Sequence, residues 1–188
     1  MITEIIHKSR SYRRFKPNVS IDCTTLRELV DLARHSPSAA NRQPLKYMLS
    51  CDAETNARIF PYTRWAGALK DWGGPTEDER PSAYIVILGD TEISKNFGCD
   101  HGIAAQSIML GATEKGLGGC MIGAVDRPGL RASLQIPERY EILLVLALGE
   151  PAETVVIENL PQDGNINYWR DEASVHHVPK RSLDDLIL

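Results

Sequence analysis

The sequence predicts an α+β fold in which a central sheet has helices on both of its sides. Two continuous apolar runs, residues 83–88 and 142–148, are typical of strands buried on both faces of a sheet. The longest apolar helical pattern covers residues 99–115, and apolar residues become sparse after Pro151. These observations predict a layered core followed by an extended C-terminal arm.

The first quarter of the chain contains two helical patterns, a loop and a strand. Residues 2–9 predict a short helix, and Asp22 is a suitable N-cap for a second helix that runs to about residue 35. The segment 36–44 is small, polar and bounded by prolines, which indicates a loop. Residues 45–51 then form a candidate strand.

The elements of the middle of the chain are separated by glycine and proline. Helical segments are expected at 52–60 and 64–70, followed by a break at Gly73-Gly74-Pro75. Gly116 ends the helix over residues 99–115 in the usual way, and residues 120–122 form a short strand. The last elements of this region are a helix opened by Asp126-Arg127-Pro128 and the apolar strand already described.

The C-terminal quarter predicts little regular structure. Residues 151–178 are expected to form an extended excursion rather than a packed element, because few of them are apolar. Ser182 and Asp185 have the spacing of a capping box, which predicts a short helix over 183–187. The organisation expected is one domain over residues 1–188, in which 151–188 is a C-terminal extension that embraces a partner subunit.

Composition and charge exclude several classes of protein. The 188 residues carry a net charge of −4, which argues against a partner with a phosphate backbone but not against a pocket for one small anion. The longest apolar stretch is too short to span a bilayer, and no apolar leader opens the chain. Cys23, Cys51, Cys99 and Cys120 are widely spaced, so reduced thiols and a cytoplasmic location are expected.

Two basic segments lie near the two ends of the chain. Arg10, Ser11 and Arg13 combine guanidinium groups with a hydroxyl, as a clamp for a phosphate does, although a solvated basic turn is the alternative. Lys180 and Arg181 precede the predicted terminal helix, whose N-terminus would favour an anion; a solvated basic pair is again the alternative.

Two further segments are candidates for contact with a flat ligand. The loop over residues 37–44 holds small side chains between two prolines, and Asn41 and Gln43 offer amide donors and acceptors. The segment 118–124 is glycine-rich, but its spacing is neither the dinucleotide fingerprint nor a P-loop. The histidines and cysteines lack the spacing of a metal site, so no metal is expected.

Taken together, these segments resemble the nitroreductase family of flavoproteins. The resemblance rests on the order of the Arg/Ser segment, the loop PSAANRQP, the helix DHGIAAQSIML, the block GLGGCMIGAVDRPGLRASLQIPERYEILLVLALGEP and the ending VHHVPKRSL. It covers nearly the whole chain, and the loop and the block over residues 116–151 are its most specific parts.

The resemblance implies a nitroreductase-like α+β fold with a mostly antiparallel central sheet, extended arms and an intertwined homodimer. It implies FMN at the subunit interface, NADH or NADPH as co-substrate, and ping-pong electron transfer to small acceptors such as nitroaromatics or quinones. No nucleic acid, membrane or dedicated acid–base residue is part of this function, since the chemistry takes place on the flavin.

The resemblance also assigns residues to the cofactor. The N-terminal segment holds the phosphate and ribityl chain, the loop reaches the flavin from the partner subunit, the turn after the short strand meets the N5 edge, and the C-terminal basic pair returns to the phosphate. In chain order these cofactor-binding residues are Arg10, Ser11, Arg13, Pro37, Ser38, Ala39, Ala40, Asn41, Gln43, Ile122, Gly123, Ala124, Lys180 and Arg181.

Some positions depart from the family pattern, and other functions stay open. Many members carry a basic residue where Ser9 stands, some carry Glu where Gly123 stands, and an aromatic residue often stands where this chain has Leu45. The alternatives are a flavin-binding carrier or sensor without turnover, and a relative with different flavin chemistry such as dehalogenation.

Overall fold

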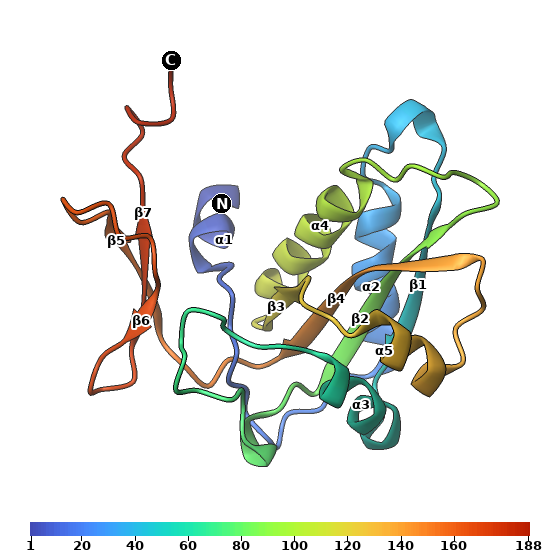
Figure 1. Cartoon of the computed structure of the whole chain (residues 1–188), viewed down its shortest axis with the longest axis horizontal. Helices are drawn as coiled ribbons and strands as arrows, with labels where there is room; N and C mark the ends of the chain where they lie inside the picture. The colour runs from blue at the N-terminus through green and yellow to red at the C-terminus, as the bar shows by residue number, and fades with distance from the viewer.

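The computed structural model describes all residues from Met1 to Leu188 and centres on a four-stranded antiparallel sheet (Figure 1). The strand order is β1-β2-β4-β3, and every neighbouring pair is antiparallel. The strands are β1 (Leu45–Ser50), β2 (Ala83–Asp90), β3 (Gly118–Ile122) and β4 (Tyr140–Gly149). The expected antiparallel α+β sheet is confirmed.

Helices cover both faces of this sheet. The helices α2 (Cys23–Arg34) and α4 (Asp100–Glu114) lie on one face, and α3 (Ala53–Ile59) and α5 (Arg127–Leu134) lie on the other. All eight residues of β2 are buried, as expected for a strand with helices on both sides.

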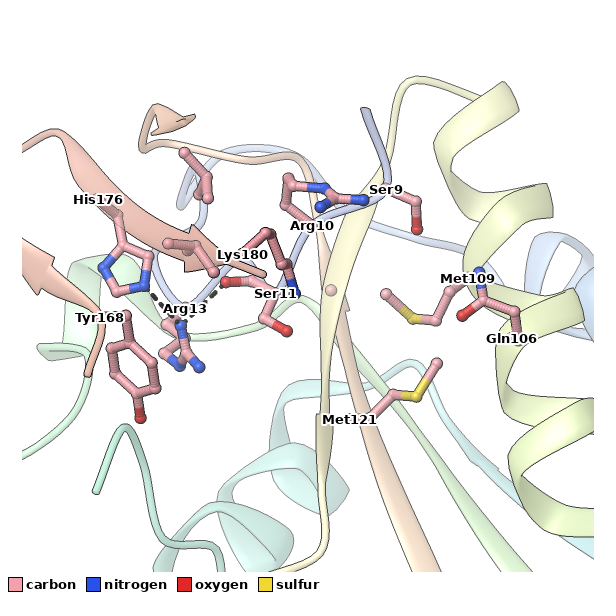
Figure 2. Close-up of a pocket in the computed structure, with 13 residues that line it drawn as sticks. Ser9, Arg10, Ser11, Arg13, Gln106, Met109, Met121, Tyr168, His176 and Lys180 are labelled. Carbon is pink, nitrogen blue, oxygen red and sulfur yellow. Dashed lines mark hydrogen bonds between the residues drawn. The ribbon is translucent and has the colours of Figure 1, made fainter. Parts of the chain in front are cut away.

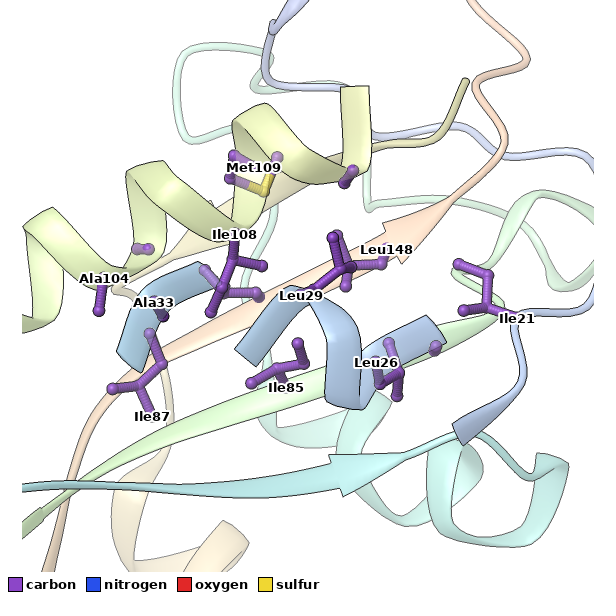
Figure 3. Close-up of a cluster of buried hydrophobic side chains, with 14 residues drawn as sticks. Ile21, Leu26, Leu29, Ala33, Ile85, Ile87, Ala104, Ile108, Met109 and Leu148 are labelled. Atoms are coloured by element: carbon purple, nitrogen blue, oxygen red, sulfur yellow. The ribbon is translucent and has the colours of Figure 1, made fainter. Parts of the chain in front are cut away.

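The core between α2, α4 and the sheet is formed mainly by Leu, Ile and Ala side chains (Figure 3). Leu26 and Leu29 of α2 and Ile108 of α4 meet Ile85 and Leu148 of the sheet, and all five are fully buried. Burial of each such side chain contributes about 1.5–3 kcal/mol. This packing fixes α4 against the sheet, and α4 in turn forms one wall of the site described below.

The predicted helix boundaries follow local hydrogen bonds. Asp22 accepts a hydrogen bond from Thr25 N at 2.6 Å and so caps α2, and Asp126 accepts from Gly129 N at 3.2 Å at the start of α5. Gly116 ends α4 with a φ of +77°, a conformation that glycine adopts at little cost. These three sequence-based assignments are confirmed.

The N-terminal segment lies between β3 and the chain that leaves β4. The helix α1 (Ile2–Lys8) precedes this segment. Tyr12 N donates to Gly119 O at 2.9 Å, and on the other side Lys16 N donates to Glu150 O, also at 2.9 Å. The segment therefore extends the main sheet at its β3 edge and brings the N-terminal arginines beside the C-terminal arm.

The C-terminal arm forms a second sheet of three strands. These are β5 (Val155–Asn159), β6 (Trp169–Arg170) and β7 (His176–Lys180), in the order β5-β7-β6, with β5 parallel and β6 antiparallel to β7. In Figure 1 the arm stands apart from the main sheet, with α1 between the arm and α4. Over 151–178 an extended excursion rather than a packed element was expected, and the small sheet corrects this, because its strands pair across gaps that local sequence does not reveal.

Two predicted helices are absent. Residues 64–70 form turns instead, because Arg64 N donates to Ala124 O at 2.9 Å and Ala66 has a φ of +41°, so tertiary pairing overrides local propensity. Over 183–187 the contacts between Ser182 and Asp185 form, but the segment is fully exposed and makes only one turn. The short 3₁₀ turns at Ala39–Asn41, Phe60–Tyr62 and Glu77–Glu79 were not predicted.

Two of the four cysteines form a disulfide, which corrects the expectation that all four are reduced. Cys23, at the start of α2, is bonded to Cys51, just after β1, with the Cα atoms 5.6 Å apart. The two residues are 28 positions apart, so their proximity depends on how α2 packs beside β1. Cys99 and Cys120 are free thiols. None of the helices combines the length and the apolar character needed to cross a bilayer.

Candidate functional site

A cavity of about 370 Å³ lies where the N-terminal segment, α4, β3 and β7 meet (Figure 2). This volume is in the range of small-molecule sites. Its lining combines cationic, hydroxyl, thioether and aromatic groups from elements far apart in the sequence. The lining residues are Ser9, Arg10, Ser11, Arg13, Gln106, Met109, Gly119, Met121, Val155, Tyr168, His176, Val178 and Lys180.

The structure brings the two basic ends of the chain together in this cavity. Arg10, Ser11 and Arg13 line it from the N-terminal segment, and Lys180 lines it from β7. Figure 2 shows these four residues facing Gln106, Met109 and Met121 across the cavity. Arg181, the first residue after β7, is exposed and does not line the cavity.

Arg10 presents an unsatisfied donor. Its terminal Nη2 donates to Ile6 O at 2.6 Å, which fixes the guanidinium, but its Nε is buried and has no hydrogen-bond partner. Lys180 forms no ion pair, so no protein carboxylate neutralises it. A buried donor without a partner is costly, and the exposed ammonium of Lys180 adds a second positive charge that no carboxylate neutralises. Arg10 and Lys180 therefore favour an anion in the cavity.

Arg13 is more deeply placed and is already engaged by the protein. Its Nη1 donates to Ser11 O at 3.1 Å and lies 3.2 Å from Nε2 of His176, and its guanidinium lies 4.7 Å from the ring centroid of Tyr168. Arg13 therefore holds the arm against the N-terminal segment as well as adding positive charge to the cavity.

The buried carboxylate of Glu153 completes this connection. It accepts hydrogen bonds from the backbone N–H groups of Arg13 and Arg14 and from Nη2 of Arg170, the last at 2.8 Å. Its side chain is only 1% exposed. One carboxylate thus links the N-terminal segment to the second sheet.

His176 stays neutral in this environment. Burial, followed by the positive charge of Arg13, lowers the pKa of His176 from its ordinary value of 6.5 to about 4. The ring also packs on Tyr168 with centroids 5.1 Å apart. A neutral imidazole beside Arg13 adds no further repulsion to the cluster of cations.

The predicted loop lies outside this cavity. In Figure 1 the loop is at the far end of α2, in sky blue, whereas β7 and the segment after α1, which carry the cationic residues of the cavity, lie on the other side of α4. Pro37, Ala39, Ala40, Asn41 and Gln43 are exposed, and Ser38 is half-buried. Within one chain, therefore, the loop and the arginines are not brought together.

The predicted turn after β3 is only partly accessible. Ile122 is 3% exposed and its side chain packs in the core beneath α5, so only its backbone is available to a ligand. Gly123 and Ala124 are exposed, and Ala124 O is occupied by Arg64 N. The β3 residues that line the cavity are instead Gly119 and Met121.

Several lining residues were missed from the sequence, although a signal for some of them exists. Gln106 and Met109 are three positions apart and lie on one face of α4. His176 and Val178 are two positions apart in β7 and so lie on the same face of the strand as Lys180, which was predicted. Tyr168 gave no signal, because its position depends on how the second sheet folds.

Known proteins with similar sequences belong to one family. The nitroreductase family model matches residues 6–74 and 80–150. A relative from Methanothermobacter thermautotrophicus, provisionally named an NADH dehydrogenase/NAD(P)H nitroreductase, is 30% identical over 163 residues, which are 81% of this chain and 78% of the relative.

Solved structures show the same fold. An FMN-dependent nitroreductase from Clostridium difficile is 24% identical, with a TM-score of 0.64 over 79% of this chain and 87% of that protein. A provisionally named nitroreductase from Exiguobacterium sibiricum, solved in complex with FMN, is 18% identical, with a TM-score of 0.68 over 81% and 89%. Since the family model covers more than half of the sequence, this chain belongs to the nitroreductase family.

Proposed function

We propose that this chain is an FMN-dependent oxidoreductase that uses NADH or NADPH to reduce small acceptors. The observation that carries the proposal is the meeting of Arg10, Ser11, Arg13 and Lys180 in one cavity. Membership of the nitroreductase family and the FMN named for two similar structures support it.

The cavity fits the phosphate end of FMN. The phosphate carries close to two negative charges, and the buried Nε of Arg10 is a donor without a partner. In the proposal Arg10 and Lys180 bind the phosphate, Ser11 donates from its hydroxyl, and Arg13 supplies charge from behind. Arg181 extends this positive surface outside the cavity.

The chemistry that FMN supplies when bound is hydride acceptance from NAD(P)H and onward electron transfer to acceptors such as nitroaromatics or quinones, in a ping-pong cycle. The chain's own part is to bind and orient. Met109 and Met121 offer a soft apolar surface to a flat ring, and Gly123 leaves its turn open at the edge of β3. The exposed backbone of Gly123 and Ala124 is proposed to face the N5 edge.

We place the cofactor between two copies of the chain. The loop residues Pro37, Ser38, Ala39, Ala40, Asn41 and Gln43 lie away from the cavity of their own chain, so in the proposal they serve the cavity of the partner. Large apolar side chains are exposed on the two elements that would embrace that partner: Ile2 and Ile6 on α1, and Leu186 and Ile187 at the C-terminus. A C2 dimer would cover them.

The proposed location is the cytoplasm, where NADH and NADPH are regenerated. The Cys23–Cys51 disulfide bears on this point, since disulfides are rare in reducing compartments. Thiol labelling of the protein in rapidly lysed cells tests it, and a fully oxidised pair would argue for an oxidising compartment.

The function is tested by purification, spectroscopy and kinetics. The protein should be yellow and dimeric, and NADH or NADPH should bleach the flavin under anaerobic conditions. Double-reciprocal plots with a nitroaromatic or quinone acceptor should give parallel lines. An apoprotein that does not take up FMN would refute the proposal, and bound flavin that no nicotinamide reduces would indicate a carrier or sensor.

A further inference from the structure

The loop proposed to reach the flavin has an unusual backbone for its sequence. Ala40, Asn41 and Gln43 have φ values of 51°, 54° and 53°, yet none of them is glycine. Such left-handed conformations are unfavourable for residues with a Cβ, although less so for asparagine, and persist where the surroundings favour them. The loop therefore needs contacts that stabilise this conformation.

One buried carboxylate meets this requirement. Asp100, the first residue of α4, is 4% exposed and accepts hydrogen bonds from Ser38 Oγ at 2.6 Å and from Ala39 N at 3.0 Å. Ser38 Oγ in turn accepts from Gln43 N at 2.9 Å. The resulting chain of bonds connects the first residue of the turn, the carboxylate and the last strained residue.

The loop also has hydrogen bonds of its own: Asn41 N donates to Ser38 O at 2.9 Å and Arg42 N donates to Ala39 O at 3.2 Å, which close the turn but do not tie it to another element. Gln43 Nε2 donates to Asn41 Oδ1 at 3.1 Å, but both residues are exposed and that contact alone is weak. The partners of Asp100 are loop donors rather than a lysine or arginine, so the carboxylate is satisfied only while the loop keeps its shape. Loop shape and carboxylate burial therefore depend on each other.

We infer that Asp100 is a positioning residue for cofactor binding: through Ser38 and Ala39 it sets the shape in which the loop meets the FMN held by the partner subunit. The inference rests on the proposed function. Asp100 itself touches no cofactor; it acts by preorganising Ala40 and Asn41, so that binding does not have to order them.

The first test compares the affinity of the apoprotein for FMN with its thermal stability. Asp100→Ala should weaken FMN binding by about tenfold or more, since two charge-assisted or backbone contacts are lost. Ser38→Ala removes only the hydrogen bond between Ser38 Oγ and Asp100 and should weaken FMN binding less. Asp100→Asn keeps one side-chain oxygen as an acceptor and should bind FMN more tightly than Asp100→Ala. Should Asp100→Ala fail to fold, Ser38→Ala and Asp100→Asn carry the test.

Asp52→Ala is the matched control. Asp52 also places a carboxylate at a helix start, where it accepts from Thr55 N at 2.8 Å, but it lies at α3 rather than beside the loop. This variant should lower the melting temperature and leave FMN affinity unchanged. FMN affinity within twofold of wild type in both Asp100→Ala and Ser38→Ala would overturn the inference.

Hybrid dimers test the action across the interface. A chain with Arg10→Ala and Lys180→Ala is paired with a chain carrying Asp100→Ala, and each parent homodimer should bind FMN poorly. In the hybrid, one site has altered cationic residues from the first chain and an altered loop from the second. The other site has the unaltered cationic residues of the second chain and the unaltered loop of the first, so half of the sites should recover wild-type affinity. Absence of this recovery would overturn the cross-subunit role, whereas wild-type protein without FMN affinity would refute the proposed function instead.

Discussion

The Arg170 guanidinium lies 2.8 Å from the carboxylate of Glu153, and the two side chains are 11% and 1% exposed. The same carboxylate accepts from the backbone of Arg13 and Arg14. Because these donors belong to the second sheet and to the N-terminal segment, Glu153 joins the two basic ends of the chain, together with the contacts of Arg13 to His176 and Tyr168. The cavity between them depends on this junction.

Glu153→Gln should loosen the arm and destabilise the fold. The substitution leaves the buried guanidinium of Arg170 without a counterion, which costs about 3 kcal/mol or more of the free energy of unfolding. Urea denaturation measures this change. Glu150→Gln is the control, since the Lys16–Glu150 pair is exposed and its loss should cost less than about 1 kcal/mol. Equal effects of the two variants would contradict the central role of Glu153.

The cationic residues of the cavity should fall into two classes. Arg10→Ala and Lys180→Ala should each weaken FMN binding by about 1.5–3 kcal/mol with little change in melting temperature. Arg13→Ala should weaken FMN binding to a similar extent and should also lower the melting temperature, because its guanidinium packs on Tyr168. Calorimetry on the apoproteins measures both quantities.

Riboflavin is the control ligand for these variants, since it lacks the phosphate. Its affinity should not change in Arg10→Ala or Lys180→Ala. A parallel loss of riboflavin and FMN affinity would show that the two residues do not act on the phosphate.

His176 predicts how stability depends on pH. Its pKa is about 4 in the folded protein and ordinarily 6.5, so between these values the unfolded chain binds more protons than the folded chain. The contribution of His176 is complete above pH 6.5 and is lost as the pH falls towards 4. In His176→Gln the denaturation midpoint should depend less on pH over this window. In His7→Gln, a substitution on the exposed surface of α1, the dependence of the midpoint on pH should match that of the wild type. A wild-type slope in His176→Gln would contradict the assignment.

Reduction of the Cys23–Cys51 disulfide should destabilise the protein. A cross-link that closes 28 residues contributes about 3–4 kcal/mol by restricting the unfolded chain. Thermal unfolding with and without a thiol reductant measures the loss. The double variant Cys23→Ser with Cys51→Ser should show the same loss and no further response to reductant, and Cys99→Ser, an exposed free thiol, should retain the response.

Two glycines at the β3 edge should respond differently to a methyl group. In Gly119→Ala the new Cβ would overlap the carbonyl oxygen of Ala147, so the strand must shift, at a cost of about 1–3 kcal/mol. In Gly123→Ala the nearest atom, on Leu144, is 4.0 Å away, and the fold should be unaffected. Any change in the rate of flavin reduction in Gly123→Ala would then be due to the N5 edge rather than to the fold. Equal melting temperatures of Gly119→Ala and Gly123→Ala would contradict the packing argument.

Local signals predicted the framework well. A continuous apolar run predicted the buried strand β2. The caps Asp22 and Asp126 could be predicted because each accepts a hydrogen bond from a residue only three positions away. The helix predicted at 64–70 failed for the opposite reason: its backbone pairs with the turn after β3, sixty residues further along. Contacts of that range leave no local pattern.

By itself, then, the sequence determined the layers of the fold, the ends of its main helices and the residue types that would clamp a phosphate. These follow from periodicity and from hydrogen bonds within a few residues. The family resemblance implied that Lys180 and Arg181 both join Arg10 at the phosphate. The tertiary structure alone decided that Lys180 lines the cavity while Arg181 does not, that Cys23 meets Cys51, and that Asp100 holds the loop at Ser38. Each of these depends on the packing of segments far apart in the chain, and such proximity has no signature in the order of neighbouring residues.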